Sequence, residues 1–143
     1  MKGFIFSIIA GMAMSVQGVM NTRLSEKTGI FESNVFVQGT AFLLSVVAAL
    51  IMGKNGYSGF AVVQKEYMFG GVLGLVITIM VMLGIGDLSP TISISVILIS
   101  QLTVAALIDA FGLLGAEKVE FGWGKYVGIA LMIGGVLLFK LRD

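Results

Sequence analysis

The sequence predicts an all-α membrane protein in which five transmembrane helices form a single domain over residues 1–143. Composition is the first reason, because 57% of the 143 residues are hydrophobic and 12% are charged, whereas a soluble domain carries about 25% charged residues. Pattern is the second reason, because stretches approaching the ~20 apolar residues that cross a bilayer recur along the chain. They run approximately over residues 3–21, 34–53, 67–86, 90–114 and 125–141.

Segments with turn or capping chemistry separate these stretches. The first stretch imitates a signal peptide, but four comparable stretches follow, so it is interpreted as a retained span. The first two breaks between spans are expected at TRLSEKTGIFES and at KNGYSGFAVVQKE. The second of these contains an Asn-Gly turn signal. In GDLSP, Ser89 is placed to cap a helix that has Pro90 at its first position. GAEKVEFGWGK precedes the last span. Aromatic residues at the predicted ends suit the headgroup level; they are Tyr57, Tyr67, Trp123 and Tyr126.

Basic residues in the loops favour neither orientation in the membrane. Lys and Arg in short loops normally fix the orientation of a membrane chain. With five spans the termini lie on opposite sides, and the nine basic residues divide almost evenly between them. The N-terminal side has Lys2, Lys54, Lys65, Lys118 and Lys125, and the other side has Arg23, Lys27, Lys140 and Arg142. We therefore expect dual topology, with protomers inserted both ways. The alternative is one orientation set by the insertion machinery.

Inverted pairing would complete a chain that is short for a transporter. Many transporters bind their substrate near the midplane, between two repeats of inverted topology. This sequence has no evident internal repeat, and five helices enclose little space. An antiparallel homodimer would supply the inverted half from a second copy and give a ten-helix inverted-repeat assembly.

Glycines at helical spacing are expected to pack helices together. In lipid, close backbone approach contributes to helix association in place of hydrophobic burial. The glycines concerned are Gly11, Gly18, Gly70, Gly74, Gly124, Gly128 and Gly134, which include two GxxxG pairs.

Five larger polar residues inside the spans are candidates for a substrate or ion pathway. They are Gln17, Asn21, Gln38, Gln101 and Asp109. Gln17 and Asn21 are four residues apart and share a helix face. Asp109 follows Gln101 by ~12 Å and ~80°, so the two face broadly one way. The amides are equally compatible with interhelical hydrogen bonds, which such side chains often make in membranes.

Asp109 places a carboxylate about 10 Å from the middle of its span. An ionised aspartate costs ~2.5–3.5 kcal/mol at a helix centre and less near the ends. Asp109 therefore either reaches headgroup water or a neighbouring helix, or lines a wet cavity and binds a proton, a cation or a cationic substrate. Gln17, Asn21 and Gln38 lie toward the opposite membrane face. Inverting a second protomer would bring its three amides to the depth of Asp109.

Several motifs together resemble the YdcZ-like inner-membrane exporters, a branch of the drug/metabolite transporter superfamily. They are QGVMNTRL (17–24), GGVLG (70–74), SQLTVAALIDAFGLLG (100–115) and GIALMIGGVLL (128–138). The resemblance covers nearly the whole chain. It implies a multi-pass protein of the bacterial cytoplasmic membrane that works as a pair of short chains. It also implies a polar signature at Gln17, Asn21, Gln101 and Asp109. Small multidrug resistance proteins exchange protons for cationic drugs at a first-helix glutamate. The first span here has no acid, so that route is not expected.

The leading expectation is alternating-access transport of a small molecule by the homodimer. The alternatives are a non-transporting membrane partner or assembly protein and, third, a dimeric channel. The chain has no His and no Cys, and no nucleophile–base pair, phosphate loop or metal-ligand spacing is visible. We therefore expect no enzyme activity, no cofactor and no metal. A net charge of +1 without a basic cluster argues against a nucleic-acid partner.

Overall fold

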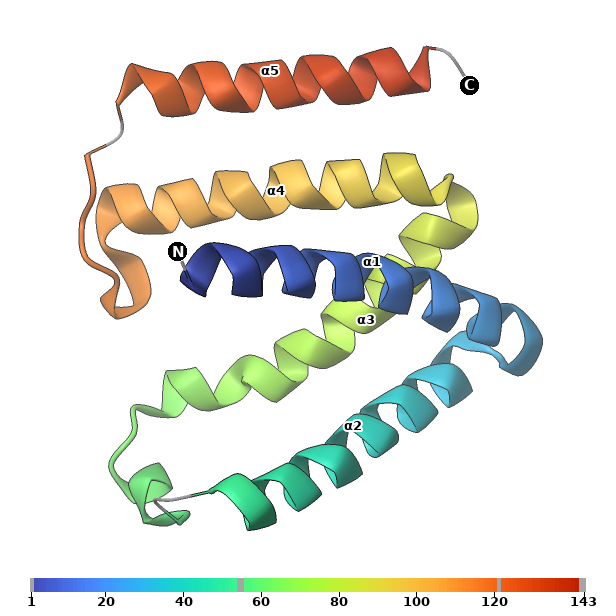
Figure 1. Ribbon diagram of the computed structural model, residues 1–143, viewed down its shortest axis with the longest axis vertical. Helices are drawn as coiled ribbons and strands as arrows, with labels where there is room; N and C mark the ends of the chain where they lie inside the picture. The colour runs from blue at the N-terminus through green and yellow to red at the C-terminus, as the bar shows by residue number, and fades with distance from the viewer. Residues whose placement is uncertain (1, 54–55, 121, 142–143) are drawn as a thin grey trace. The chain divides into compact units, whose positions relative to one another are not determined.

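A computed structural model describes residues 2–53, 56–120 and 122–141. Throughout these ranges the regular structure is helical (Figure 1), which confirms the predicted all-helical class. The long helices are α1 (Lys2–Thr28), α2 (Ile30–Met52), α3 (Gly70–Asp87), α4 (Pro90–Phe111) and α5 (Trp123–Lys140). Three short 3₁₀ helices are η1 (Ser58–Ala61), η2 (Lys65–Phe69) and η3 (Leu113–Gly115).

In the part of the chain that the structure describes, four helical segments are long and apolar enough to cross a membrane, judged by length and composition. They are Lys2–Thr28, Ile30–Met52, Lys65–Asp87 and Pro90–Phe111. The fifth helix, α5, is shorter, with 18 residues that rise about 27 Å, slightly less than the ~30 Å hydrocarbon core of a bilayer. The described long helices therefore match the predicted spans in number; α3 also has 18 residues, but η2 extends its apolar segment to 23.

The chain forms two compact units, one up to Asp87 and one from Leu88. In the first unit, α1 packs against both α2 and α3, and α2 also contacts α3. At Gly18, α1 packs closely on α3, because an added Cβ would lie 3.0 Å from Ile85 Cδ1 and 3.2 Å from Val81 Cγ1. Thr22, one turn later, is buried and donates a 2.8 Å hydrogen bond to the Gly18 carbonyl.

The helix break falls inside the predicted segment TRLSEKTGIFES, but only at Gly29 and not directly after residue 21. Helix α1 continues through Thr28, and Gly29 alone separates it from α2. No Gly or Pro interrupts residues 21–28, and Arg23 pairs with Glu26 one turn ahead at 3.1 Å, so the segment has no reason to leave the helix. Gly29 makes the turn at φ 95°, a conformation that L side chains rarely adopt.

The connection between α2 and α3 contains η1 and η2, and α3 itself begins at Gly70 rather than at residue 67. The predicted Asn-Gly turn includes Asn55, which lies outside the described residues, as do Lys54 and Arg142 from the charge comparison.

In the second unit, α4 packs against α5. The predicted start of α4 is confirmed: Ser89 is the N-cap, its Oγ accepts from the Ile92 amide at 3.4 Å, and Pro90 follows it. The predicted end at residue 114 was three residues late, because Gly112 adopts the left-handed conformation (φ 63°) that commonly stops a helix. Leu114 is also left-handed, at φ 55°.

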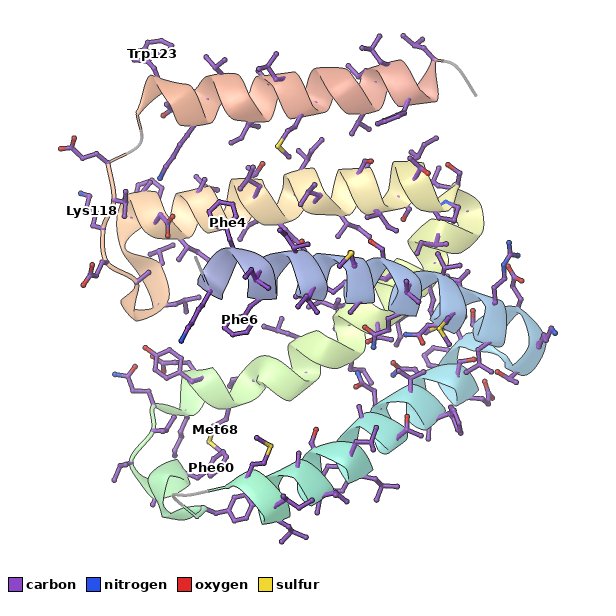
Figure 2. The ribbon with its side chains drawn as sticks, in the orientation of Figure 1. Phe4, Phe6, Phe60, Met68, Lys118 and Trp123 are labelled. Atoms are coloured by element: carbon purple, nitrogen blue, oxygen red, sulfur yellow. The ribbon has the colours of Figure 1, made fainter. Side chains whose placement is uncertain are left out.

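Large apolar side chains are exposed on every long helix. Phe4 and Phe6 of α1 and Trp123 of α5 project from their helices (Figure 2), and Phe4 and Trp123 are 80% and 84% exposed. Few residues of the apolar windows are buried within the chain. Exposure on this scale fits a protein whose solvent is lipid.

Candidate functional site

Gln17 and Asn21 lie together on a groove between α1 and α2 that has a volume of about 590 Å³. Their four-residue spacing predicts a shared face, and both side chains line this one groove. Asn21 is 9% exposed, whereas Gln17 is open. Opposite them, α2 contributes a stripe that includes Val37, Thr40 and Ala41. The groove is therefore mixed in character, with amides on one wall and mostly apolar side chains on the other.

Two cations line the same groove near the α1–α2 turn. Arg23 and Lys27 come from the last two turns of α1. Arg23 also forms a surface ion pair with Glu26, with Nη1–Oε1 and Nη1–Oε2 both 3.1 Å. The sequence analysis used these residues only for orientation. They are four residues apart and share one helix face, but that face is turned by about 120° (Arg23) and about 80° (Lys27) from Gln17. Helical spacing alone therefore gave no signal that they line the same groove as the amides.

Gln38 makes a contact with α3 instead of lining that groove. Its Nε2 donates to Thr78 Oγ1 at 3.4 Å, and the Thr78 hydroxyl donates in turn to the Gly74 carbonyl at 2.8 Å. A Cβ added at Gly74 would be 3.8 Å from Gln38 Nε2, an ordinary contact. This contact is a long interhelical hydrogen bond, beyond the about 2.7–3.2 Å that is usual for N–H···O.

Asp109 lines a separate pocket of about 200 Å³ within the second unit. Ala105 and Ala106 of α4 and Lys125 and Gly128 of α5 line it too. A carboxylate and an ammonium group therefore border one small cavity. The Asp109 carbonyl also accepts from the Val119 amide at 2.9 Å, which ties the returning loop to the end of α4. The sequence signal for Lys125 was that both residues sit at the same end of two consecutive antiparallel helices.

Gln101 is exposed and lines neither of these pockets. It lies two turns before Asp109 on α4, and Ala105, midway between them, does line the Asp109 pocket. The expected common direction of Gln101 and Asp109 therefore does not bring them into one cavity.

Asn34 is a buried amide that the sequence analysis took only as the start of the second span. It is 3% exposed, and its Oδ1 has no hydrogen-bond partner among the described residues. Ser33 beside it is also buried and donates to the Gly29 carbonyl at 2.7 Å. Polar atoms thus gather under the α1–α2 turn, although a buried carbonyl oxygen normally has a partner.

The glycines expected to pack helices differ in their surroundings. Gly18 faces Val81 and Ile85 closely, and Gly74 faces Gln38. Among the described residues, no atom lies within 4 Å of a Cβ built on the others; these are Gly11, Gly70, Gly124, Gly128 and Gly134. Their packing role stays a prediction.

No group of three or more acidic side chains that could hold a metal ion occurs in the described part of the chain.

The family of the chain follows from a comparison with family models. The model described as "Putative inner membrane exporter, YdcZ" matches residues 3–138. No curated protein and no solved structure gives a significant match. The matched range includes the residues that line the α1–α2 groove and the Asp109 pocket, and all of the five long helices except Lys2 of α1 and the last two residues of α5. With its long exposed apolar helices, this multi-pass membrane chain belongs to the YdcZ family.

Proposed function

We propose that the chain is one half of an alternating-access transporter for a small molecule in the bacterial cytoplasmic membrane. The observation that carries the proposal is the groove that Gln17 and Asn21 share, in a chain whose family is described as exporters. Transporter sites are typically formed between helices by a few polar groups within apolar walls. The groove has this composition.

The second half would be another copy of the chain in the opposite orientation. The near-even division of basic residues supports two-way insertion. The extensive exposed apolar surface of both units leaves ample area for pairing. In an antiparallel pair, Gln17 and Asn21 of one protomer come to the membrane depth of Asp109 in the other. The pathway would then contain the amide groove, Gln101 and the Asp109 pocket.

Asp109 would act as the titrating or ion-binding group of the pathway. Lys125 in its pocket offers a competing role, in which the carboxylate only stabilises the packing of α4 on α5. Comparing Asp109→Asn with Lys125→Gln separates the two. A packing role makes both substitutions lower the stability in detergent and leave flux per folded protein unchanged. A transport role makes Asp109→Asn abolish saturable flux in folded protein.

The decisive experiment measures solute flux in proteoliposomes for the parent chain and Asp109→Asn. Saturable uptake that the substitution abolishes supports a carrier. Uptake that never saturates favours a channel, and no flux for any solute class favours a non-transporting partner. Cross-linking between cysteines at positions 109 and 17, or 109 and 21, tests the dimer. Cross-links confined to parallel pairs, or termini that all emerge on one side, would refute inverted pairing.

A further inference from the structure

The α1–α2 groove is positively charged, and this bears on the substrate. Among the side chains that line it, Arg23 and Lys27 are charged, and no carboxylate is present. The remaining polar lining comes from Gln17, Asn21 and Thr40. An anion entering this groove meets two cations and several hydrogen-bond donors, whereas a cation meets repulsion.

Charge and apolar surface are ordered along the groove. Lys27 and Arg23 lie in the last two turns of α1, beside the tight turn at Gly29. Gln17 lies ten residues before Lys27, about 15 Å along the helix axis. Apolar side chains from both helices cover the distance between them, among them Met20, Leu24 and Phe36. The groove thus offers one charged end and an elongated apolar wall.

The ion pair between Arg23 and Glu26 does not prevent Arg23 from binding an anionic ligand. The two side chains are 71% and 48% exposed, and exposed pairs of this kind contribute about 0–1 kcal/mol. Glu26 is not among the lining residues of the groove. An anionic ligand can therefore replace Glu26 at the guanidinium, and Glu26 competes weakly with it.

We infer that the groove binds a single-chain amphiphilic organic anion, and that this is the chemical class of the transported substrate. Its phosphate or carboxylate would bind at Lys27 and Arg23, its chain would lie on the apolar wall, and the amides of Gln17 and Asn21 would meet polar groups further along. The volume of about 590 Å³ suits one drug-sized molecule, within the ~300–1,000 Å³ of typical ligand sites. The inference rests on the proposed transport function.

Photolabelling tests the site without requiring flux. The probe is a decyl phosphate that carries a diazirine on its chain, applied to the full chain in phosphatidylcholine nanodiscs, with labelled peptides mapped by mass spectrometry. We expect saturable labelling of α1 and α2 that octyl phosphate displaces and octyltrimethylammonium does not. Replacing Arg23 or Lys27 by Gln should each weaken binding about fivefold. Glu26→Gln should strengthen it, since it removes the competing carboxylate.

Lys65→Gln is the matched control, because this exposed lysine lies outside the groove and its loss changes net charge equally. Binding that is unchanged in the Arg23 and Lys27 variants, or equally reduced by Lys65→Gln, overturns the inference. So does equal displacement by the cationic competitor. Displacement of the probe by phosphatidylglycerol as readily as by octyl phosphate would mean that a membrane lipid occupies the groove, which overturns the substrate assignment.

Flux measured in parallel separates the inference from the function on which it rests. Labelling with the expected pattern but no saturable flux of decyl phosphate or of any other solute refutes the proposed function. Saturable flux of a cationic solute, with no anion labelling of α1 and α2, refutes the anionic substrate and leaves a transporter.

Discussion

The contact between Gly18 and α3 makes a quantitative prediction about helix packing. A Cβ at position 18 would be 3.0 Å from Ile85 Cδ1 and 3.2 Å from Val81 Cγ1, whereas carbon atoms are at optimal separation at about 3.5–4.0 Å. The methyl group of Gly18→Ala is therefore about 0.5–1 Å too close to Ile85 Cδ1 and about 0.3–0.8 Å too close to Val81 Cγ1. Overpacking of this kind costs ~1–3 kcal/mol. The Ile85 terminal methyl can rotate away, but the β-branched Val81 is stiff.

Gly11→Ala is the matched control, because no described atom lies within 4 Å of its added Cβ. Both substitutions gain up to about 1 kcal/mol of helix propensity. We expect Gly11→Ala to stabilise the protein slightly and Gly18→Ala to be less stable than Gly11→Ala by ~1–3 kcal/mol. Unfolding in mixed micelles of dodecyl maltoside and sodium dodecyl sulfate, followed by circular dichroism, measures this difference.

Ile85→Val sharpens the test, since it deletes the Cδ1 atom that lies nearest to the added methyl group. Alone it should cost about 0.5–1.5 kcal/mol. In the Gly18→Ala background, Ile85→Val should lower the free energy of unfolding by much less than it does in the parent. The double-mutant cycle should therefore give a coupling of about 1 kcal/mol. Equal stability of the two alanine variants with no coupling would refute the close approach of α1 and α3.

Three further predictions concern single contacts. Ser89→Ala removes the N-cap of α4 and should destabilise the protein by about 0.5–1 kcal/mol in the same unfolding assay, whereas Ser89→Asp should retain stability; equal loss in both would argue against capping. Leu114→Gly should stabilise by up to about 1 kcal/mol, since relief of a left-handed leucine, ~1–2 kcal/mol, exceeds the added entropy of the unfolded chain, ~0.5–1 kcal/mol; a lower melting temperature would contradict it. Gln38→Leu and Thr78→Val should each cost about 0.6 kcal/mol and leave flux per folded protein unchanged. A selective loss of flux in Gln38→Leu would instead place Gln38 on the pathway.

The sequence predicted the position of a helix best where the residues concerned have a single structural role. The apolar stretches fix the helices, and Ser89 with Pro90 fixes the start of α4 within one residue. The ends that were misjudged depended on weaker signals. Residues 21–28 are mostly polar, and this led to the expectation that the first helix ends near residue 21. Polarity alone does not end a helix, and α1 continues to Thr28, directly before Gly29.

The candidate site was predictable along each helix but not between helices. The shared face of Gln17 and Asn21 follows from helical geometry. Which helix each face meets does not, because apolar side chains around the whole circumference leave no preferred direction for packing. The turn of Gln38 toward Thr78, and the placement of Lys125 beside Asp109, therefore needed coordinates.

The single glycine between α1 and α2 constrains how the chain enters the membrane. With one residue for a hinge, neither helix has enough slack to cross the bilayer independently of the other. We expect the two helices to insert together as a hairpin, so that Arg23, Glu26 and Lys27 at its tip all cross the bilayer or all stay behind. Under the proposed two-way insertion, orientation would then be decided once for both helices, while the hairpin forms. Lengthening the hinge with a few flexible residues should permit mixed, half-inverted products.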